Sequence, residues 1–272
     1  MNQEIYEKYE IIDAHTHIFP DKIAEHATVN IGRFYNLPMN SDGISLKLIQ
    51  SGDEIGVKKY LVCSSATSPH QTESINNFIA EECSKNPKLF GLGTAHPLSE
   101  NVEADIEQVK KLGLHGIKIH PDFMKINADS PENFKIYEII EGVMPVLFHC
   151  GDDRYDYSSP KRIANIHKNF PKLKILSAHL GGYQKWDEAE EYLKGLENVC
   201  FDISSSMAFM PPEHTAHMIN AYGAENCLFG SDFPMWSIKK EADRFLSLGF
   251  SEEQNRLVFG QNFKRFFEIQ NL

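Results

Sequence analysis

The sequence predicts one closed (β/α)₈ barrel, the TIM-barrel fold. Three observations predict it: eight short apolar segments recur along the chain, helical patterns separate them, and no Gly/Ser- or Pro-rich linker divides the 272 residues. Alternating strands and helices imply a parallel sheet, and eight such units in a chain of this length favour closure into a barrel. We therefore expect a single domain over residues 1–272.

The apolar segments are nearly continuous runs, which is typical of strands buried on both faces. From the second onward they recur roughly every 25–30 residues, the spacing of one βα unit. The predicted strands are Glu10–Ala14, Lys59–Cys63, Leu89–Thr94, Gly116–Ile119, Pro145–Phe148, Lys174–Ala178, Val199–Ile203 and Cys227–Gly230.

The stretches between these segments carry helix signals. Residues Glu100–Leu112 place apolar side chains on one stripe and stop at Gly113, and Ser251 with Gln254 forms a capping-box pattern before the last helix. The long segment Ile18–Ser45 is expected to be an insertion over one barrel mouth. An open doubly wound sheet is the alternative fold, but no G-x-G-x-x-G or G-x-x-x-x-G-K-[ST] element supports it.

Composition restricts the partners and the compartment. The formal net charge is -11 and no run of Lys and Arg occurs, which disfavours binding to nucleic acid or to an anionic membrane. The five cysteines include no C-x-x-C pair, which argues against a disulfide framework and a thiolate zinc site. The N-terminus is polar, and no run of about 18 apolar residues could span a bilayer. We expect a soluble, cytoplasmic protein that acts on a small molecule.

Ionisable residues stand where several predicted strands end. The first strand leads into the pair His15 and His17, and His149, His179 and Asp232 end the fifth, sixth and eighth strands. Residues i and i+2 of a strand share a face, and the carboxyl ends of barrel strands converge on one axis. A lone histidine is usually structural, but several ionisable groups buried together cost several kcal/mol each unless something pairs them. Imidazoles with one carboxylate make a good zinc site with an open position.

The pattern resembles the amidohydrolase superfamily, and more narrowly its amidohydrolase-related, type 2 branch, which includes aminocarboxymuconate-semialdehyde decarboxylase-like enzymes. The resemblance extends over nearly the whole chain. The segments that carry it are Asp13–His17 with Phe19-Pro20, Gly116–Pro121, Phe148-His149, His179–Gly182, Phe229–Pro234 and Phe259–Phe266.

The resemblance implies a role for each of these residues. His15, His17, His149 and Asp232 would bind a divalent metal, with Asp232 also taking a proton from the metal-bound water as general base. His179 would orient that water, stabilise developing charge or bind a second metal. Zinc is the expected ion, although manganese, iron and nickel accept similar ligands.

Lys118 lies on the fourth predicted strand and has two interpretations. In binuclear members of the superfamily a carboxylated lysine on this strand bridges two metals, and His149 and His179 would then hold the second one. The interpretation we favour is an unmodified cation that pairs with a carboxylate or with substrate, because the type 2 branch resembles a single-metal site.

Other residues near the predicted mouth are candidates for substrate binding. Arg154 could clamp a substrate carboxylate, and its alternative is a surface salt bridge. Trp236 and Phe19 could line an apolar pocket, and each is equally consistent with packing. His120 shares a strand face with Lys118 and also has a structural alternative.

Three functions remain open from the sequence. The favoured one is a metal-dependent hydrolase that uses an activated water on a small amide, lactone or ester. The alternative is a metal-dependent non-oxidative decarboxylase of a small carboxylic acid, which would gain support if Lys118 proved unmodified and Arg154 bound a carboxylate. A barrel that binds a metal without chemistry is disfavoured by His179 and Asp232. A homodimer is common among similar proteins, but the sequence does not reveal the oligomeric state.

Overall fold

The computed structural model describes residues 3–270, and within them the predicted barrel is present. Every neighbouring pair of strands runs parallel. The third barrel strand is interrupted at Leu92 and is labelled β3 and β4, so the nine labelled strands form eight barrel strands. They are β1 (Ile12–His17), β2 (Lys59–Cys63), β3 (Leu89–Gly91), β4 (Gly93–Thr94), β5 (Ile117–Ile119), β6 (Val146–Phe148), β7 (Ile175–Ser177), β8 (Val199–Asp202) and β9 (Cys227–Leu228).

Backbone hydrogen bonds between β1 and the segment that continues β9 close the barrel. The Ala14 amide donates to the Phe229 carbonyl at 2.8 Å, and the His17 amide donates to the Phe233 carbonyl at 2.6 Å. The Asp232 amide donates in the opposite sense, to the His15 carbonyl at 2.9 Å. Closure therefore places Asp232 directly beside the H-x-H pair.

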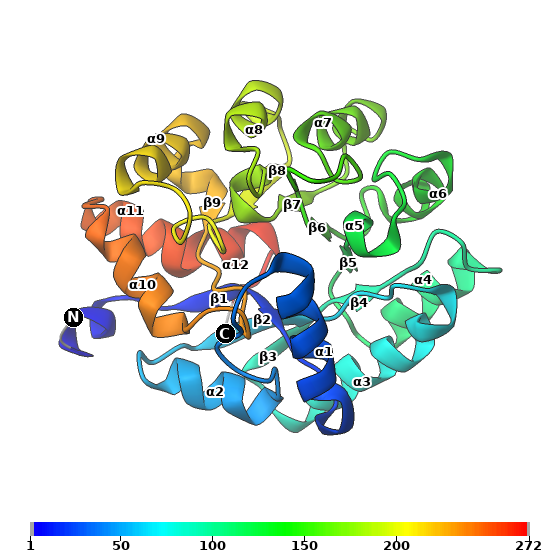
Figure 1. The fold of residues 1–272 in the computed structure, drawn as a ribbon, viewed down its shortest axis with the longest axis horizontal. Helices are drawn as coiled ribbons and strands as arrows, with labels where there is room; N and C mark the ends of the chain where they lie inside the picture. Colours follow the sequence, from blue (N-terminus) through cyan, green and yellow to red (C-terminus); the bar gives the residue numbers. More distant parts are fainter. Residues whose placement is uncertain (1–2, 271–272) are drawn as a thin grey trace.

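Helices form a ring around the strands, and α1 (Asp21–Tyr35) lies across their ends (Figure 1). Segment 18–45, expected to cover one mouth, contains this helix and its flanking loops. Within residues 3–270 no helix is both long enough and apolar enough to cross a membrane. The other helices are α2 (Ser45–Asp53), α3 (Thr72–Lys85), α4 (Val102–Lys111), α5 (Pro121–Met124), α6 (Pro131–Ile140), α7 (Pro160–Asn169), α8 (Trp186–Leu193), α9 (Pro212–Tyr222), α10 (Ile238–Ser247), α11 (Glu252–Arg256) and α12 (Asn262–Phe266).

The barrel interior is apolar near the amino ends of the strands and polar near their carboxyl ends. Buried side chains such as Leu61, Leu147 and Leu176 form the apolar part, and Phe263 and Phe266 of α12 pack against it. The polar part begins where the metal-site candidates lie. An apolar base of this kind holds the strands rigidly under the site, which favours a fixed geometry.

An irregularity in β1 turns the two histidines into the barrel. Ile12 and Ala14 belong to the interior cluster, so a regular alternation would send His15 to the opposite face. The pairing of β1 with β2 shifts register between Asp13 and Thr16, and the rings of His15 and His17 line the interior cavity. The sequence argument from i and i+2 spacing was incomplete, because this irregularity is also needed.

Candidate metal centre and active site

Backbone conformations that are rare for non-glycine residues surround the site. His179, Ser205 and Asp232 have φ values of 60°, 52° and 58°. Such left-handed conformations cost on the order of 1 kcal/mol each and persist when the surrounding structure requires them. Here they direct three polar side chains from the ends of β7, β8 and β9 toward one region.

His15, His17 and Asp232 form the centre of the site. The Nε2 atoms of His15 and His17 lie 3.1 Å apart, and Oδ1 of Asp232 lies 3.3 Å from His17 Nε2 and 3.8 Å from His15 Nε2. One ligand atom of each residue lies within 4.8 Å of the other two, an arrangement able to hold a metal ion. Three of the four predicted ligands are therefore already gathered.

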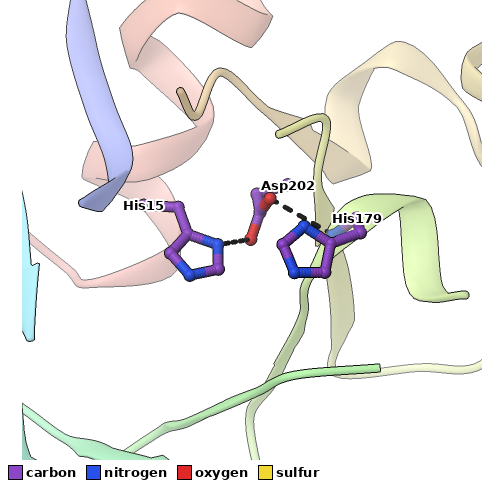
Figure 2. Close-up of side chains that lie close together, drawn as sticks. All are labelled: His15, His179 and Asp202. Carbon is purple, nitrogen blue, oxygen red and sulfur yellow. Dashed lines mark hydrogen bonds and ion pairs between the residues drawn. The ribbon is translucent and has the colours of Figure 1, made fainter. Parts of the chain in front are cut away.

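Asp202 determines which nitrogen of His15 faces this centre. Its Oδ2 lies 2.9 Å from His15 Nδ1, and its Oδ1 accepts from the His179 amide at 3.3 Å (Figure 2). Oδ1 also accepts from the amide of Ser204 at 3.1 Å. A carboxylate on Nδ1 places the ring proton there and leaves the Nε2 lone pair for a metal, the usual arrangement of a metal-bound histidine.

In His149 and His179, as in His15, an oxygen acceptor fixes which ring nitrogen carries the proton, but the acceptors differ. His149 Nε2 lies 2.9 Å from the Gly151 carbonyl, and His179 Nδ1 lies 3.1 Å from the Ser204 carbonyl. Each contact assigns a proton to that nitrogen, because a carbonyl oxygen only accepts. The remaining nitrogens, His149 Nδ1 and His179 Nε2, face each other at 3.1 Å.

These residues fit a divalent cation. His15, His149 and His179 each have one nitrogen satisfied by an oxygen acceptor and one lone pair directed inward, and lone pairs 3.1 Å apart repel unless a proton or a cation lies between them. His149 is not among the three ligands gathered around Asp232; it groups with His120 and Asp122 instead. It faces the same cavity, so the fourth predicted ligand lies at the edge of the centre.

The electrostatics of the site keep His15 and His149 neutral and Asp232 ionised, but they protonate His17. Burial alone would lower the pKa of His17, whereas Cys63 and Asp232 raise it to about 9, so a metal that binds His17 must displace a proton. Burial, reinforced by the neighbouring cations, lowers the pKa of His15 and His149 well below the usual value. Burial alone would raise the pKa of Asp232, but the hydrogen bond from His17 and the nearby His15 and His179 hold it well below its ordinary value. Neutral imidazole and ionised carboxylate are the protonation states that bind a metal.

A cavity of about 750 Å³ opens above these residues. Lys118, His120 and Phe19, all predicted to bind substrate, line it. Lys118 is fully buried and its Nζ lies 3.2 Å from His15 Nε2. The His120 ring stacks on His149 at 4.0 Å between centroids, and its Nε2 lies 3.0 Å from the Tyr35 hydroxyl.

Arg154 does not have the place expected for a carboxylate clamp. Its Nε and Nη2 donate to the two oxygens of buried Asp152 at 2.8 and 2.6 Å, and its Nη1 donates to the Phe34 carbonyl at 2.5 Å. It is not among the residues that line the cavity. The guanidinium instead ties the loop after β6 to the last turn of α1, because Asp152 lies two residues away and satisfies it first.

Trp236 is also absent from the cavity wall. Its Nε1 donates to Ser205 Oγ at 2.8 Å, and Ser205 Oγ donates to Asp232 Oδ2 at 2.6 Å. Trp236 therefore supports Asp232 from behind, and the residues that line the cavity on this side are Pro234 and Met235. The sequence prediction placed the aromatic ring on the wrong side of the loop.

Sequence reasoning missed three residues that shape the site. Asp202 stands at a strand end like the predicted ligands, so the same rule would have found it. Ser205 gave no signal, because a serine after a strand is ordinary. Tyr35 reaches the site from α1, and its hydroxyl lies 3.4 Å from His149 Nε2, a contact that no local sequence pattern encodes.

The amidohydrolase family profile matches residues 12–269. The chain belongs to the amidohydrolase family. This match includes every strand of the barrel and every residue of the centre described above. No curated protein sequence matches this amidohydrolase significantly.

Solved structures with the same fold are distant in sequence. A 5-carboxyvanillate decarboxylase from Novosphingobium aromaticivorans, complexed with manganese, has a TM-score of 0.76 at 16% identity, over 99% of this chain and 100% of that one. A 2,6-dihydroxybenzoate decarboxylase from Rhizobium has 0.74 at 14%, over 97% and 100%. A probable 2-pyrone-4,6-dicarboxylic acid hydrolase from Acinetobacter baumannii has 0.70 at 14%, over 96% and 100%. At these identities the likeness concerns the fold.

Proposed function

We propose that this amidohydrolase is a metal-dependent non-oxidative decarboxylase of a small carboxylic acid. The sequence favoured hydrolysis, but two of the three structural relatives described above are decarboxylases. The observation that carries the proposal is Lys118. It is fully buried beside His15, and within residues 3–270 no carboxylate forms an ion pair with it. A buried ammonium whose described polar partner is the His15 imidazole, and not a carboxylate, has no counter-ion, which is costly, so the site has a cation ready for a substrate carboxylate.

In this proposal His15, His17, His149 and Asp232 hold one divalent metal, zinc or manganese, which when bound would polarise the oxygens of the substrate. Lys118 pairs with the carboxylate, and the apolar side chains of the cavity surround the body of the substrate. Breaking the bond between carbon and carboxylate leaves an electron pair on that carbon and releases CO₂. One proton must then reach the carbon. That proton comes from water, and Asp232 and His179, which both face the cavity, are the groups placed to relay it.

Hydrolysis is the second candidate, and it also depends on Lys118. Were Lys118 carboxylated, it would be an anion that bridges two metals, with His149 and His179 holding the second one. The contact between His149 Nδ1 and His179 Nε2 at 3.1 Å is compatible with a shared cation. The modification state of Lys118 therefore separates the two functions.

The test uses manganese-loaded protein with two groups of compounds. Hydroxybenzoates, including 2,6-dihydroxybenzoate and 5-carboxyvanillate, would be assayed in D₂O for CO₂ release and for one deuterium at the decarboxylated carbon. Lactones, including 2-pyrone-4,6-dicarboxylate, would be assayed in H₂¹⁸O for ring opening with ¹⁸O. Decarboxylation with deuterium incorporation supports the proposal. Ring opening without CO₂ release contradicts it and favours hydrolysis.

Two lysines of the cavity give a matched comparison. Lys118 and Lys125 both line it, but Lys125 is exposed. Lys118→Met should weaken binding of a carboxylate substrate by about 10–100-fold, since a hydrogen bond between charged groups contributes about 1.5–3 kcal/mol. Lys125→Met should change it by less than about threefold. Equal effects of the two variants would contradict the role of Lys118.

A further inference from the structure

The cavity extends far beyond the metal centre, along one face of α1. Ile23, Ala27, Ile31 and Phe34 line it, and their spacing of three or four residues places them on a single stripe of the helix. At 1.5 Å rise per residue the stripe is about 16 Å long. A hydroxybenzoate bound at the metal would occupy only the inner end of such a space.

Helix α3 lines the same outer part of the cavity. Ser74, Ile75 and Phe78 contribute from this helix, again at a helical spacing. We call the six apolar side chains on the two helices the α1–α3 groove, and these are Ile23, Ala27, Ile31, Phe34, Ile75 and Phe78. In Figure 1, α1 (blue) and α3 (cyan) both lie in the lower right part of the view.

Helix α1 has an unusual distribution of side chains. Its buried residues are the small ones, Ala24, Thr28 and Gly32, whereas the larger Ile23 has 51% of its surface exposed. A surface helix normally turns its large apolar side chains toward the core. Here they face the groove, and α1 packs extensively against no other described helix or strand. Phe34 contacts the Phe123 ring of α5 at 4.9 Å and the Arg154 guanidinium at 4.6 Å, so the apolar surface left for a ligand is the part of the stripe from Ile23 to Ile31, which lines the cavity.

We propose that the substrate is an amphipathic carboxylic acid whose apolar tail lies in the α1–α3 groove while its carboxylate lies at the metal centre. This rests on the proposed function for the position of the carboxylate. The two ends of the cavity differ in chemistry: Lys118 and the metal ligands form the inner end, and the aliphatic and aromatic side chains of the α1–α3 groove dominate the outer end, with polar side chains such as His26, Asn30 and Ser74 beside them. A carboxylate joined to an extended apolar chain matches both.

The proposal gives a graded expectation. Burial of one methylene contributes about 0.8 kcal/mol, which is about a fourfold change in affinity. Affinity should therefore rise severalfold with each added methylene until the groove is filled, and then stop rising. Binding by a site limited to the metal centre would not depend on the length of the chain.

The experiment is calorimetric titration of the manganese-loaded protein with butanoate, octanoate and dodecanoate, each below its micellar concentration. Ile23→Asp and Val29→Asp form the matched pair, because both side chains are exposed on α1 (51% and 41%) and only Ile23 lines the cavity. We expect Ile23→Asp to reduce the octanoate affinity at least tenfold and to leave butanoate nearly unchanged. Val29→Asp should affect neither.

Each other outcome is informative. Equal affinities along the series, or equal losses in both variants, overturn the groove proposal while leaving decarboxylation intact. Loss of chain-length dependence together with a dimer that Ile23→Asp dissociates overturns it in favour of a subunit interface. The alkanoates are binding probes only, because they have no group that could accept the electron pair left by loss of CO₂. Chain-length dependence of their binding with no CO₂ release from the hydroxybenzoates supports the groove and contradicts the proposed reaction instead.

Discussion

Replacing Asp202 by asparagine tests the organisation of the metal centre most directly. Oδ1 of Asp202 accepts from the amides of His179 and Ser204 and from the Ser204 hydroxyl, whereas the one polar contact of Oδ2 within residues 3–270 is His15 Nδ1. An asparagine would place its oxygen where the three donors are. Its NH₂ group would then face His15 Nδ1 and donate to it. The His15 proton would move to Nε2, the atom that the metal needs.

The expected loss of metal affinity follows from the contact between Asp202 and His15. Loss of such an indirect partner typically lowers metal affinity by 10–100-fold, which corresponds to about 1.4–2.7 kcal/mol. The assay is Mn²⁺ binding by electron paramagnetic resonance, with thermal unfolding to confirm that the variant is folded. Glu241→Gln is the matched control, since Glu241 is a fully buried carboxylate on α10 outside the centre. A folded Asp202→Asn protein that binds Mn²⁺ as tightly as the parent would refute the tautomer argument.

Three further predictions concern charge. Lys118→Met should be as stable as the parent or more stable in thermal unfolding, because it removes a buried cation that no described carboxylate pairs with. In ¹³C NMR after growth on labelled bicarbonate the parent should show no carbamate, and a carbamate signal would favour the two-metal alternative. Burial raises the pKa of Glu241 to about 7 from 4.5, so Glu241 ionises in the unfolded state first and the free energy of unfolding falls as pH rises from about 4.5 to 7. Glu241→Gln should remove up to about 3 kcal/mol of that loss. A difference between variant and parent in urea unfolding that does not depend on pH would contradict this prediction. Arg154→Lys should increase hydrogen exchange in the last turn of α1, because it lowers the local opening free energy there by about 0.5–1 kcal/mol, and it should leave the affinity for carboxylate ligands unchanged. Unchanged exchange with a weaker carboxylate affinity would instead support Arg154 as a carboxylate-binding residue.

The barrel was predictable because its strands are buried on both faces. Every predicted strand overlaps an observed one, although the first extends beyond Ala14 to His17 and the third is interrupted at Leu92. Burial on both faces produces continuous apolar runs, a signal that depends on no distant contact. The ends of strands were less well defined, since one or two hydrogen bonds decide them.

The site was predictable where a strand end determines direction, and not where a loop does. His15, His17 and Asp232 lie together because β1, which contains the two histidines, neighbours the segment after β9 that contains Asp232. Arg154 follows a strand end by several residues, and its partners are chosen by local geometry. Tyr35 depends on how α1 crosses the mouth. Sequence spacing contains none of this information.

The network around the imidazoles explains why the centre would remain ordered before a metal arrives. His15, His149 and His179 are each oriented by a different acceptor, namely Asp202, the Gly151 carbonyl and the Ser204 carbonyl. Asp202 and Ser204 lie two residues apart at the end of β8, and Asp202 accepts from the amides of Ser204 and His179. Loss of Asp202 would therefore disturb His15 and His179 together, whereas His149, which is oriented by Gly151 after β6, would stay in place. Ligands that are oriented in advance lose little conformational freedom on binding. Affinity should therefore fall stepwise as acceptors are removed, and the removal of Asp202 should cost most, since it is the only charged acceptor of the three.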